Sequence, residues 1–417
     1  MTQTADTINT HAFNNGLFFV SERMSGVRSA SIRWMLPGGA VFEDIHNLGA
    51  SAVCAEMLMR GAGELDSRKQ ADAFDRAGAL RDISNSIRYM QLSVSTLGHR
   101  VHESIPLMRD IVRRASMSSD SFAPAQELAL QAVASLSDDP QQRTALAARA
   151  RHLPSPYNRN TIGTSEGIAS LTHGQLLDWW GAHSVPSGSV IAVAGDVDHD
   201  SVVEQIGEMI DGWVGKAEMP ETQDQSPRGY AHIEDESSQV QIMVVHDAPH
   251  EGHDDAMLEK LVISVLSGGM SGRLFSEVRE KRGLCYAVSS SYRADKDRGV
   301  VTNYVGTTPE RAQESLDVLC GELQRINSGD VTQDELTRAM TGLKSRLIFS
   351  GESTSARAGA ICADWINLGR VRTLEEIIEA LSGVTLDELN SYLRRRSLGE
   401  MTIQTLGPSA LDEPQSV

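Results

Sequence analysis

The two halves of this 417-residue chain repeat one order of predicted strands and helices. Thr172 lies near the start of the helical segment LTHGQLLDWWGAHS, and Thr385 holds the same place in VTLDELNSYLRRRS, 213 residues later. The strand pattern SVIAVAGDVD contains Gly195 and recurs 212 residues on as MTIQTLGPS, which contains Gly407. Because a nearly constant offset links so many elements, the sequence predicts two domains of one design.

A polar segment with two prolines, 215–228, separates the halves and is predicted to be a linker. We therefore expect an N-terminal domain at 1–214 and a C-terminal domain at 229–417. Alternating apolar residues in NGLFFVSE and RSASIRWML predict a β-hairpin over 14–43. Both domains mix strands and helices, which makes the expected fold class α+β, and paired domains of this kind commonly enclose a ligand cleft.

The remaining elements follow from apolar residues spaced three and four apart in helices and two apart in strands. Helices are predicted at 47–61, 67–77, 102–115, 123–136, 142–152, 170–184, 201–209, 254–268, 273–283, 309–326, 332–348, 355–369 and 384–397. Further strands are predicted at 79–84, 88–96, 189–198, 239–248, 284–293, 299–307 and 401–409.

Charge and cysteine content limit the classes of function. With 56 acidic against 38 basic residues, the net charge is −18, so nucleic acid and anionic membranes are poor partners. The four cysteines show no CxxC spacing, which favours buried thiols and a reducing, cytoplasmic location. The first residues lack the basic start and apolar core of a signal peptide, and no run of 18 apolar residues predicts a membrane span.

Three segments carry a resemblance to a known family. They are NGLFFVSERMSGVRSASI, NRNTIGTSEGIASLTHGQLLDWWGAHSVPSGSVIAVAGDVD and, most specifically, SGGMSGRLFSEVREKRGLCYAVSSSY. Together they make the chain similar over nearly its whole length to the M16 (pitrilysin/insulinase) zinc peptidases, subfamily B. The resemblance implies two homologous α/β-sandwich domains of the LuxS/M16 metallohydrolase-like type, which form half of a clamshell.

The helix at 47–61, NLGASAVCAEMLMRG, resembles the family's metal-binding helix but lacks its chemistry. Two histidines four residues apart can bind one zinc, with a glutamate as the base for the bound water. Aligned on MLMRG, Ala52 and Glu56 stand at the histidine positions and Ala55 at the glutamate position. Ala132, with Gln131 beside it, stands where the third ligand is expected. The sequence therefore predicts no metal site in this chain, with zinc expected in a partner subunit.

The N-terminal substrate-binding strand also departs from the family. Asp82 and Ile83 stand where Asn-Ala is common, and Arg88 stands where Glu is common. In the C-terminal half, by contrast, Arg279 and Tyr286 occupy the positions of an arginine and a tyrosine that bind substrate in active members. A fixed cation and a phenol can both donate hydrogen bonds to a developing oxyanion. The alternative is structural, with Arg279 in a surface ion pair and Tyr286 at the start of a core strand.

A second cluster could suggest a metal site. HDAPHEGHDD contains His246, His250, His253, Asp254 and Asp255, and imidazole with carboxylate can bind zinc or nickel. The spacing fits no closed site, and we expect Asp254 or Asp255 to cap the following helix instead. No phosphate-binding glycine motif lies between a strand and a helix, so the sequence predicts no nucleotide site.

These features favour a non-catalytic subunit of a heterodimeric M16B-type peptidase. It would bind peptide and supply Arg279 and Tyr286 in trans to a zinc-bearing paralogue. A homodimeric peptide-binding or assembly scaffold without an enzymatic partner is the competing hypothesis. An active hydrolase with a rebuilt site is the weakest, because no other nucleophile and base are evident.

Overall fold

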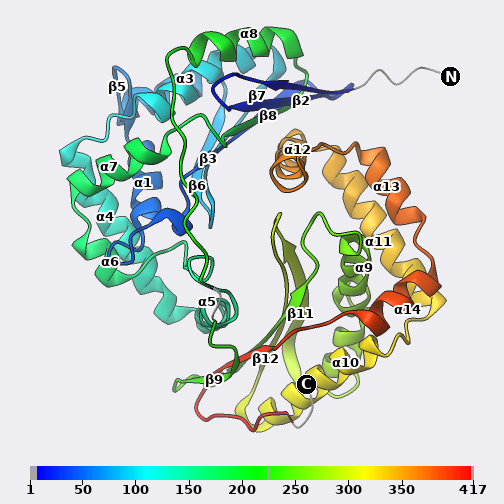
Figure 1. Cartoon of the computed structure of the whole chain (residues 1–417). Coiled ribbons are helices and arrows are strands. Elements are labelled where there is room, and N and C mark those ends of the chain that lie inside the picture. Colours follow the sequence, from blue (N-terminus) through cyan, green and yellow to red (C-terminus); the bar gives the residue numbers. More distant parts are fainter. Residues whose placement is uncertain (1–6, 224–225, 415–417) are drawn as a thin grey trace, which may run out of the picture. The chain divides into compact units, whose positions relative to one another are not determined.

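The computed structural model describes residues 7–223 and 226–414, so residues 224–225 of the predicted linker lie outside the described part. The chain forms two compact units (Figure 1). The first contains 1–135, 155–223 and 350–371, and the second contains 136–154, 224–349 and 372–417. The ranges 1–214 and 229–417 thus supply most of each unit, but each unit also takes one helical segment from the other half.

The first unit is built on a six-stranded sheet in the order β1-β2-β8-β3-β7-β6. Its strands are β1 (Ile8–Ala12), β2 (Phe18–Arg23), β3 (Ser29–Pro37), β6 (Leu80–Asn85), β7 (Tyr89–Leu97) and β8 (Val190–Gly195), with a small separate pair β4 (Gly61–Ala62) and β5 (Leu65–Asp66).

The predicted hairpin over 14–43 is wrong in its pairing. Both strands form, but β8 lies between them, parallel to β2 and antiparallel to β3. All six residues of β8 are buried. A strand that is apolar on both faces buries the most apolar surface, and is therefore most stable, in the interior of a sheet. The unpredicted β1 pairs with the other side of β2.

Helices cover both faces of this sheet. They are α1 (Ala50–Leu58), α2 (Ser67–Arg76), α3 (Val101–Arg113), α4 (Ser119–Ala134), α6 (Ser165–Ser170), α7 (His173–His183), α8 (His199–Met209) and α12 (Thr354–Leu368), with short turns η1 (Ala40–Phe42) and η2 (Gly98–Arg100). Phe19 of β2 faces the main core with α1, whereas Phe18 and Val20 face the opposite way and pack against Ile361 of α12. The two-residue alternation of a strand therefore gives the sheet two apolar faces.

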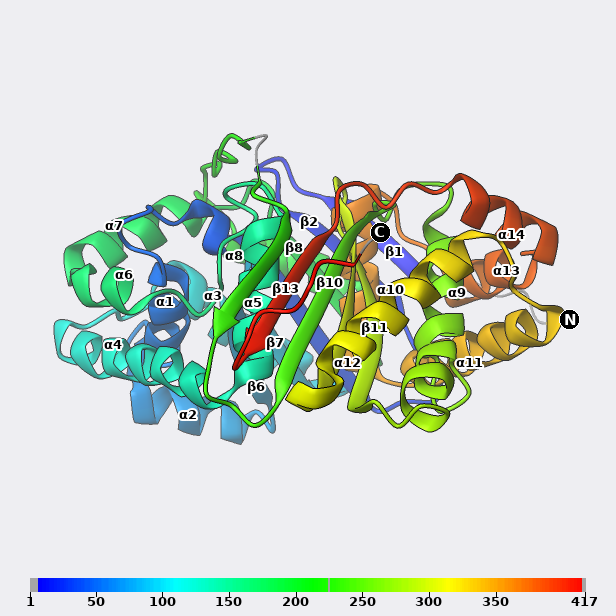
Figure 2. The same cartoon turned by 90° about the horizontal axis from the view of Figure 1, so that it is seen from below.

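The second unit repeats this arrangement. Its strands are β9 (Gly229–Glu234), β10 (Val240–Ala248), β11 (Cys285–Ala294), β12 (Gly299–Thr307) and β13 (Thr402–Gly407), in the order β11-β12-β10-β13-β9. Strands β9, β13 and β10 lie side by side in Figure 2. Taken in the same direction, the strand order of the first sheet is β6-β7-β3-β8-β2. In each sheet the last two of these strands are parallel: β13 with β9, and β8 with β2. The predicted repeat and the α+β fold class are confirmed.

The second unit's helices are α5 (Pro140–His152), α9 (Ala256–Ser267), the π-helix η4 (Phe275–Glu280), α10 (Ala312–Asn327), α11 (Gln333–Gly351), α13 (Leu374–Ser382) and α14 (Leu386–Arg395), with short turns η3 (Ser135–Asp138) and η5 (Pro309–Arg311). Helix α9 follows β10 as α1 follows β3, so the two predicted helices hold equivalent places in the chain order. Helix α5 packs on β10 and β13 through Ala148, which contacts Met243, Val245 and Tyr304. Strands β1, β4, β5 and β9 and helices α6 and α13 were not predicted.

Within the described ranges, every helix is too short or too polar to cross a bilayer. The four cysteines are free and buried there, as predicted. Burial raises the pKa of Cys320 and of Cys362 to about 12.

Candidate functional site

Arg279 lies near the end of a π-helical turn in the second unit. The turn η4 is wider than an α-helix, a geometry that is frequent at functional sites. The Arg279 side chain is exposed, and its guanidinium carbon lies 5.0 Å from the centre of the Phe275 ring. Gly283, at a φ of +61°, ends the turn in the left-handed conformation that glycine adopts without strain, as the sequence predicted.

Tyr286 lies at an irregularity in the edge strand β11. Cys285 pairs with Thr307 and Ala287 with Gly306, so Tyr286 is the extra residue of a β-bulge. Bulges redirect side chains, and Tyr286 is 68% exposed although Leu284 and Cys285 beside it are buried. The alternative in which Tyr286 starts a core strand is therefore wrong.

Arg279 is electrostatically coupled to the start of β11. Burial raises the pKa of the Cys285 thiol to about 11, and the charge of Arg279 opposes this rise. Arg279, on a helical turn, and Tyr286, on a strand, are thus two exposed hydrogen-bond donors on either side of Gly283 in the sequence.

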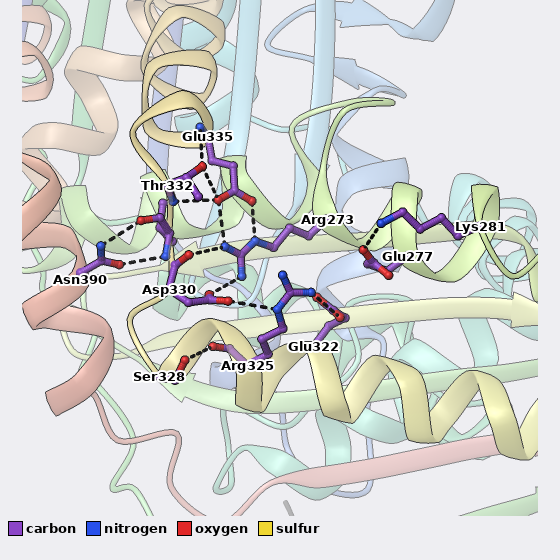
Figure 3. Close-up of polar contacts among 11 residues, drawn as sticks. Arg273, Glu277, Lys281, Glu322, Arg325, Ser328, Asp330, Thr332, Glu335 and Asn390 are labelled. Carbon is purple, nitrogen blue, oxygen red and sulfur yellow. Dashed lines mark hydrogen bonds and ion pairs between the residues drawn. The ribbon is translucent and has the colours of Figure 1, made fainter.

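An ion-pair network around the buried Arg273 holds the start of this turn (Figure 3). Arg273 is 7% exposed; its Nε lies 2.6 Å from Glu335 Oε1, and its Nη1 lies 2.5 Å from Asp330 Oδ1. Its Nη2 donates to Glu335 Oε2 at 2.9 Å and to the Asp330 carbonyl at 3.0 Å. Such bidentate, charge-assisted contacts are among the strongest hydrogen bonds in proteins.

The acidic partners of Arg273 are fixed in turn. Thr332 donates from its backbone and its hydroxyl to Glu335, both at 2.9 Å, and Arg325 Nε contacts Asp330 at 3.0 Å. Further along the turn, Glu277 accepts from Lys281 at 2.6 Å, as Figure 3 also shows. The Arg273 contacts attach the segment that carries Arg279 to the junction of α10 and α11. Local sequence patterns did not identify Arg273, because its carboxylate partners lie 57 and 62 residues away.

The degenerate metal positions lie on α1 and α4, which pack together in the first unit. Ala55 is buried, Ala52 and Glu56 are partly exposed, and Ala132 is exposed. The Glu56 carboxylate lies 4.0 Å from Arg60, one turn on. Alanine has no donor atom, so the zinc that the family resemblance implies does not fit these residues.

The Glu43 carboxylate holds the start of α1. Glu43 is buried and accepts hydrogen bonds from the backbones of Gly49 and Ser51, both at 2.8 Å. Burial raises the pKa of Glu43, and these hydrogen bonds oppose the rise. Gly49 precedes α1 at a φ of +114°, so α1 begins at Ala50, later than the predicted start at 47.

The histidine-rich loop forms no metal centre in the described part of the chain, where no group of three or more His, Cys, Asp or Glu side chains is arranged to hold an ion. His246 is buried in β10, whereas His250 and His253 stack edge to face with ring centres 5.7 Å apart. Asp255 occupies the cap position of α9, but its side chain pairs with Arg395. The prediction that this carboxylate caps the helix is therefore wrong, because an arginine competes for it.

The altered substrate-strand residues have separate places in the first unit. Asp82 and Ile83 lie on β6, an edge strand of the first sheet. Arg88 is buried, with its guanidinium carbon 4.5 Å from the centre of the Tyr157 ring. Arg88 thus contributes to packing as a cation–π partner.

Comparisons with known proteins point to one family. Residues 170–343 match the Peptidase M16 inactive domain family. An uncharacterized zinc protease of Mycobacterium tuberculosis is 25% identical over 94% of this chain and 91% of its own length. The uncharacterized zinc protease YmxG of Bacillus subtilis is 24% identical over 96% of this chain and 98% of its own length.

Solved structures share the fold over nearly the full chain. A peptidase M16 inactive domain from Pseudomonas fluorescens superposes with a TM-score of 0.85 at 21% identity, covering 98% of this chain and 99% of its own. A protease from Helicobacter pylori gives 0.86 at 18% identity, with coverages of 96% and 99%. The resemblance to the M16 peptidases is confirmed: residues 170–343 match the inactive-domain family, and the whole chain shares the fold of solved M16 structures.

Proposed function

We propose that this chain is the non-catalytic subunit of a heterodimeric M16B-type metallopeptidase. In this proposal it binds the peptide substrate and presents Arg279 and Tyr286 to a scissile bond held by a zinc-bearing paralogue. The observation that carries the proposal is a contrast between the two units. Arg279 and Tyr286 are exposed on anchored elements, whereas Ala52, Ala55 and Ala132 stand at the metal positions.

The chemistry assigned to this chain is charge stabilisation. The partner's zinc would activate the attacking water. The Arg279 guanidinium and the Tyr286 hydroxyl would donate hydrogen bonds to the carbonyl oxygen as negative charge develops on it. Both donors would be in position before the peptide binds, because the Arg273 network holds the π-turn and the bulge directs Tyr286 outward.

A reducing, cytoplasmic location belongs to the same proposal. Four free, buried thiols support it, because secreted proteins commonly pair their cysteines. The competing hypothesis of a homodimeric peptide-binding scaffold uses the same exposed pair without an enzymatic partner.

Co-purification from the native host tests the proposal. A tagged copy of the full chain is isolated under mild conditions, and its companions are identified by mass spectrometry. We expect a stoichiometric paralogue that contains H-x-x-E-H and carries zinc. Recovery of a homodimer alone, with no paralogue at any salt concentration tested, would favour the scaffold and contradict the heterodimer.

A further inference from the structure

Helix α5 and the sheet of the second unit line an open cavity of about 420 Å³. The apolar side chains that line it, together called the apolar floor, include Met243 of β10, Val300 of β12 and Leu146 of α5. Serine and threonine hydroxyls from Ser289 and Thr302 also line it. A volume of this size lies within the range of small-molecule and side-chain pockets.

The charge of this cavity is opposite to that of the whole chain. Arg149 of α5 and Arg293 of β11 both line it, and no Asp or Glu stands among the described residues that do so. The chain as a whole carries 56 acidic and 38 basic residues. Two guanidinium groups in one cavity are therefore a local feature and not a consequence of composition.

The charges of the two arginines repel each other. Burial lowers the pKa of Arg149, the charge of Arg293 lowers it further, and Asp295 partly opposes both effects. An anion between the guanidinium groups would relieve this repulsion, and guanidinium binds carboxylate through paired hydrogen bonds.

One lining residue, His152, is held by contacts with residues outside the cavity. His152 is fully buried, with Nδ1 3.0 Å from Thr402 Oγ1 and Nε2 3.2 Å from Asp247 Oδ1. Asp247 also accepts from Arg228 at 2.6 Å. The nearby carboxylate of Asp247 is thus engaged by two partners of its own and does not line the cavity.

We propose that this cavity binds a carboxylate, with Arg149 and Arg293 as the charged contacts, hydroxyls such as Ser289 and Thr302 as further donors, and the apolar floor accepting the methylene groups beside it. The carboxylate can come from a free small acid or from the acidic side chain of a peptide. The proposal does not require a zinc-bearing partner, so it can fail while the proposed function stands, and the reverse.

Isothermal titration calorimetry of the isolated full chain tests this proposal. The probes are glutarate, its neutral analogue glutaramide, and two blocked peptides that differ only in one Glu or Gln. We expect glutarate or the Glu peptide to bind and the neutral counterpart to bind about tenfold more weakly or not at all, as loss of a charged contact implies. Binding of glutarate alone identifies a free acid, and binding of the Glu peptide identifies a peptide side chain.

Substitutions connect the binding to the cavity. Arg149→Gln with Arg293→Gln should weaken the Kd at least about tenfold. Arg293→Gln alone, at an exposed side chain, keeps the test valid if the double variant does not fold. Arg338→Gln removes an arginine that is 52% exposed elsewhere in the same unit and should leave the Kd unchanged. Absence of binding by both carboxylate probes at millimolar concentration, or equal binding to all folded variants, would overturn the proposal.

Discussion

Replacing Arg273 with methionine should destabilise the second unit by about 3 kcal/mol. Removal of one partner from a buried ion pair costs about 3–5 kcal/mol, since the remaining charge is left without compensation. Asp330 keeps its contact with Arg325 at 3.0 Å, which places the expected cost at the lower end. The direction of the Glu335 pKa shift agrees: burial would raise this pKa, but contacts with Arg273 and Thr332 lower it to about 2.

Urea unfolding can assign this loss to one unit. All five tryptophans lie in the first unit, namely Trp34, Trp179, Trp180, Trp213 and Trp365. Fluorescence therefore reports that unit, whereas circular dichroism reports both. With an m-value of about 2 kcal/mol/M, the Arg273→Met transition seen by circular dichroism should move down by about 1.5 M urea.

Arg338→Met is the matched control. Arg338 pairs with Asp334 at 3.8 Å with both side chains largely exposed, and such pairs contribute about 0–1 kcal/mol. We expect its urea midpoint to stay within about 0.5 M of wild type. If Arg273→Met also stays within that limit, the network does not hold the π-turn as argued.

The stability difference between wild type and Arg273→Met should depend on pH. The folded-state pKa of Glu335 is depressed, so its contribution to stability is present above pH 4.5 and is lost as pH falls toward 2. The difference in unfolding free energy between wild type and Arg273→Met should therefore narrow over this interval. A difference that is constant or widens between pH 5 and pH 2.5 would show that Glu335 is not the titrating partner.

Two further predictions concern metal and thiols. Purified alone, the chain should hold no stoichiometric zinc after mild dialysis, because Ala52, Glu56 and Ala132 cannot complete a site; elemental analysis showing one zinc per chain would contradict this. The four buried thiols should react with Ellman's reagent only after denaturation, because burial keeps them protonated and inaccessible. Rapid reaction of even one thiol in the native chain would show an opening that the structure lacks.

The sequence predicted the elements and the repeat well because both depend on local periodicity and on a nearly constant offset. It failed where a choice depends on distant residues. Alternation in NGLFFVSE and RSASIRWML identifies two strands, but only the burial of 190–195 decides that a third strand separates them. Likewise, the carboxylate of Asp255 fits a helix cap until Arg395, 140 residues away, engages it.

The candidate site shows the same limit. A motif identified Arg279 and Tyr286, and Gly283 predicted the end of the turn between them. The β-bulge that directs Tyr286 outward follows from the register of β11 against β12, which local pattern does not encode. The helix at 140–152 lies in the first half of the sequence but packs on the sheet of the second unit, and the helix at 354–368 lies in the second half but packs on the sheet of the first. No local sequence pattern indicates this exchange.

Steady-state cleavage of a quenched peptide by the reconstituted pair tests the central claim most directly. Arg279→Ala and Tyr286→Phe, each made only in this chain, should leave the complex intact by size-exclusion chromatography. Because loss of one oxyanion contact costs about 2.7–4 kcal/mol, turnover by the zinc-bearing partner should fall at least about tenfold and up to about 10³-fold. Arg338→Ala, at an exposed arginine of the same unit, should leave turnover unchanged. Wild-type turnover in both the Arg279 and Tyr286 variants, with the complex assembled, would contradict a role in trans.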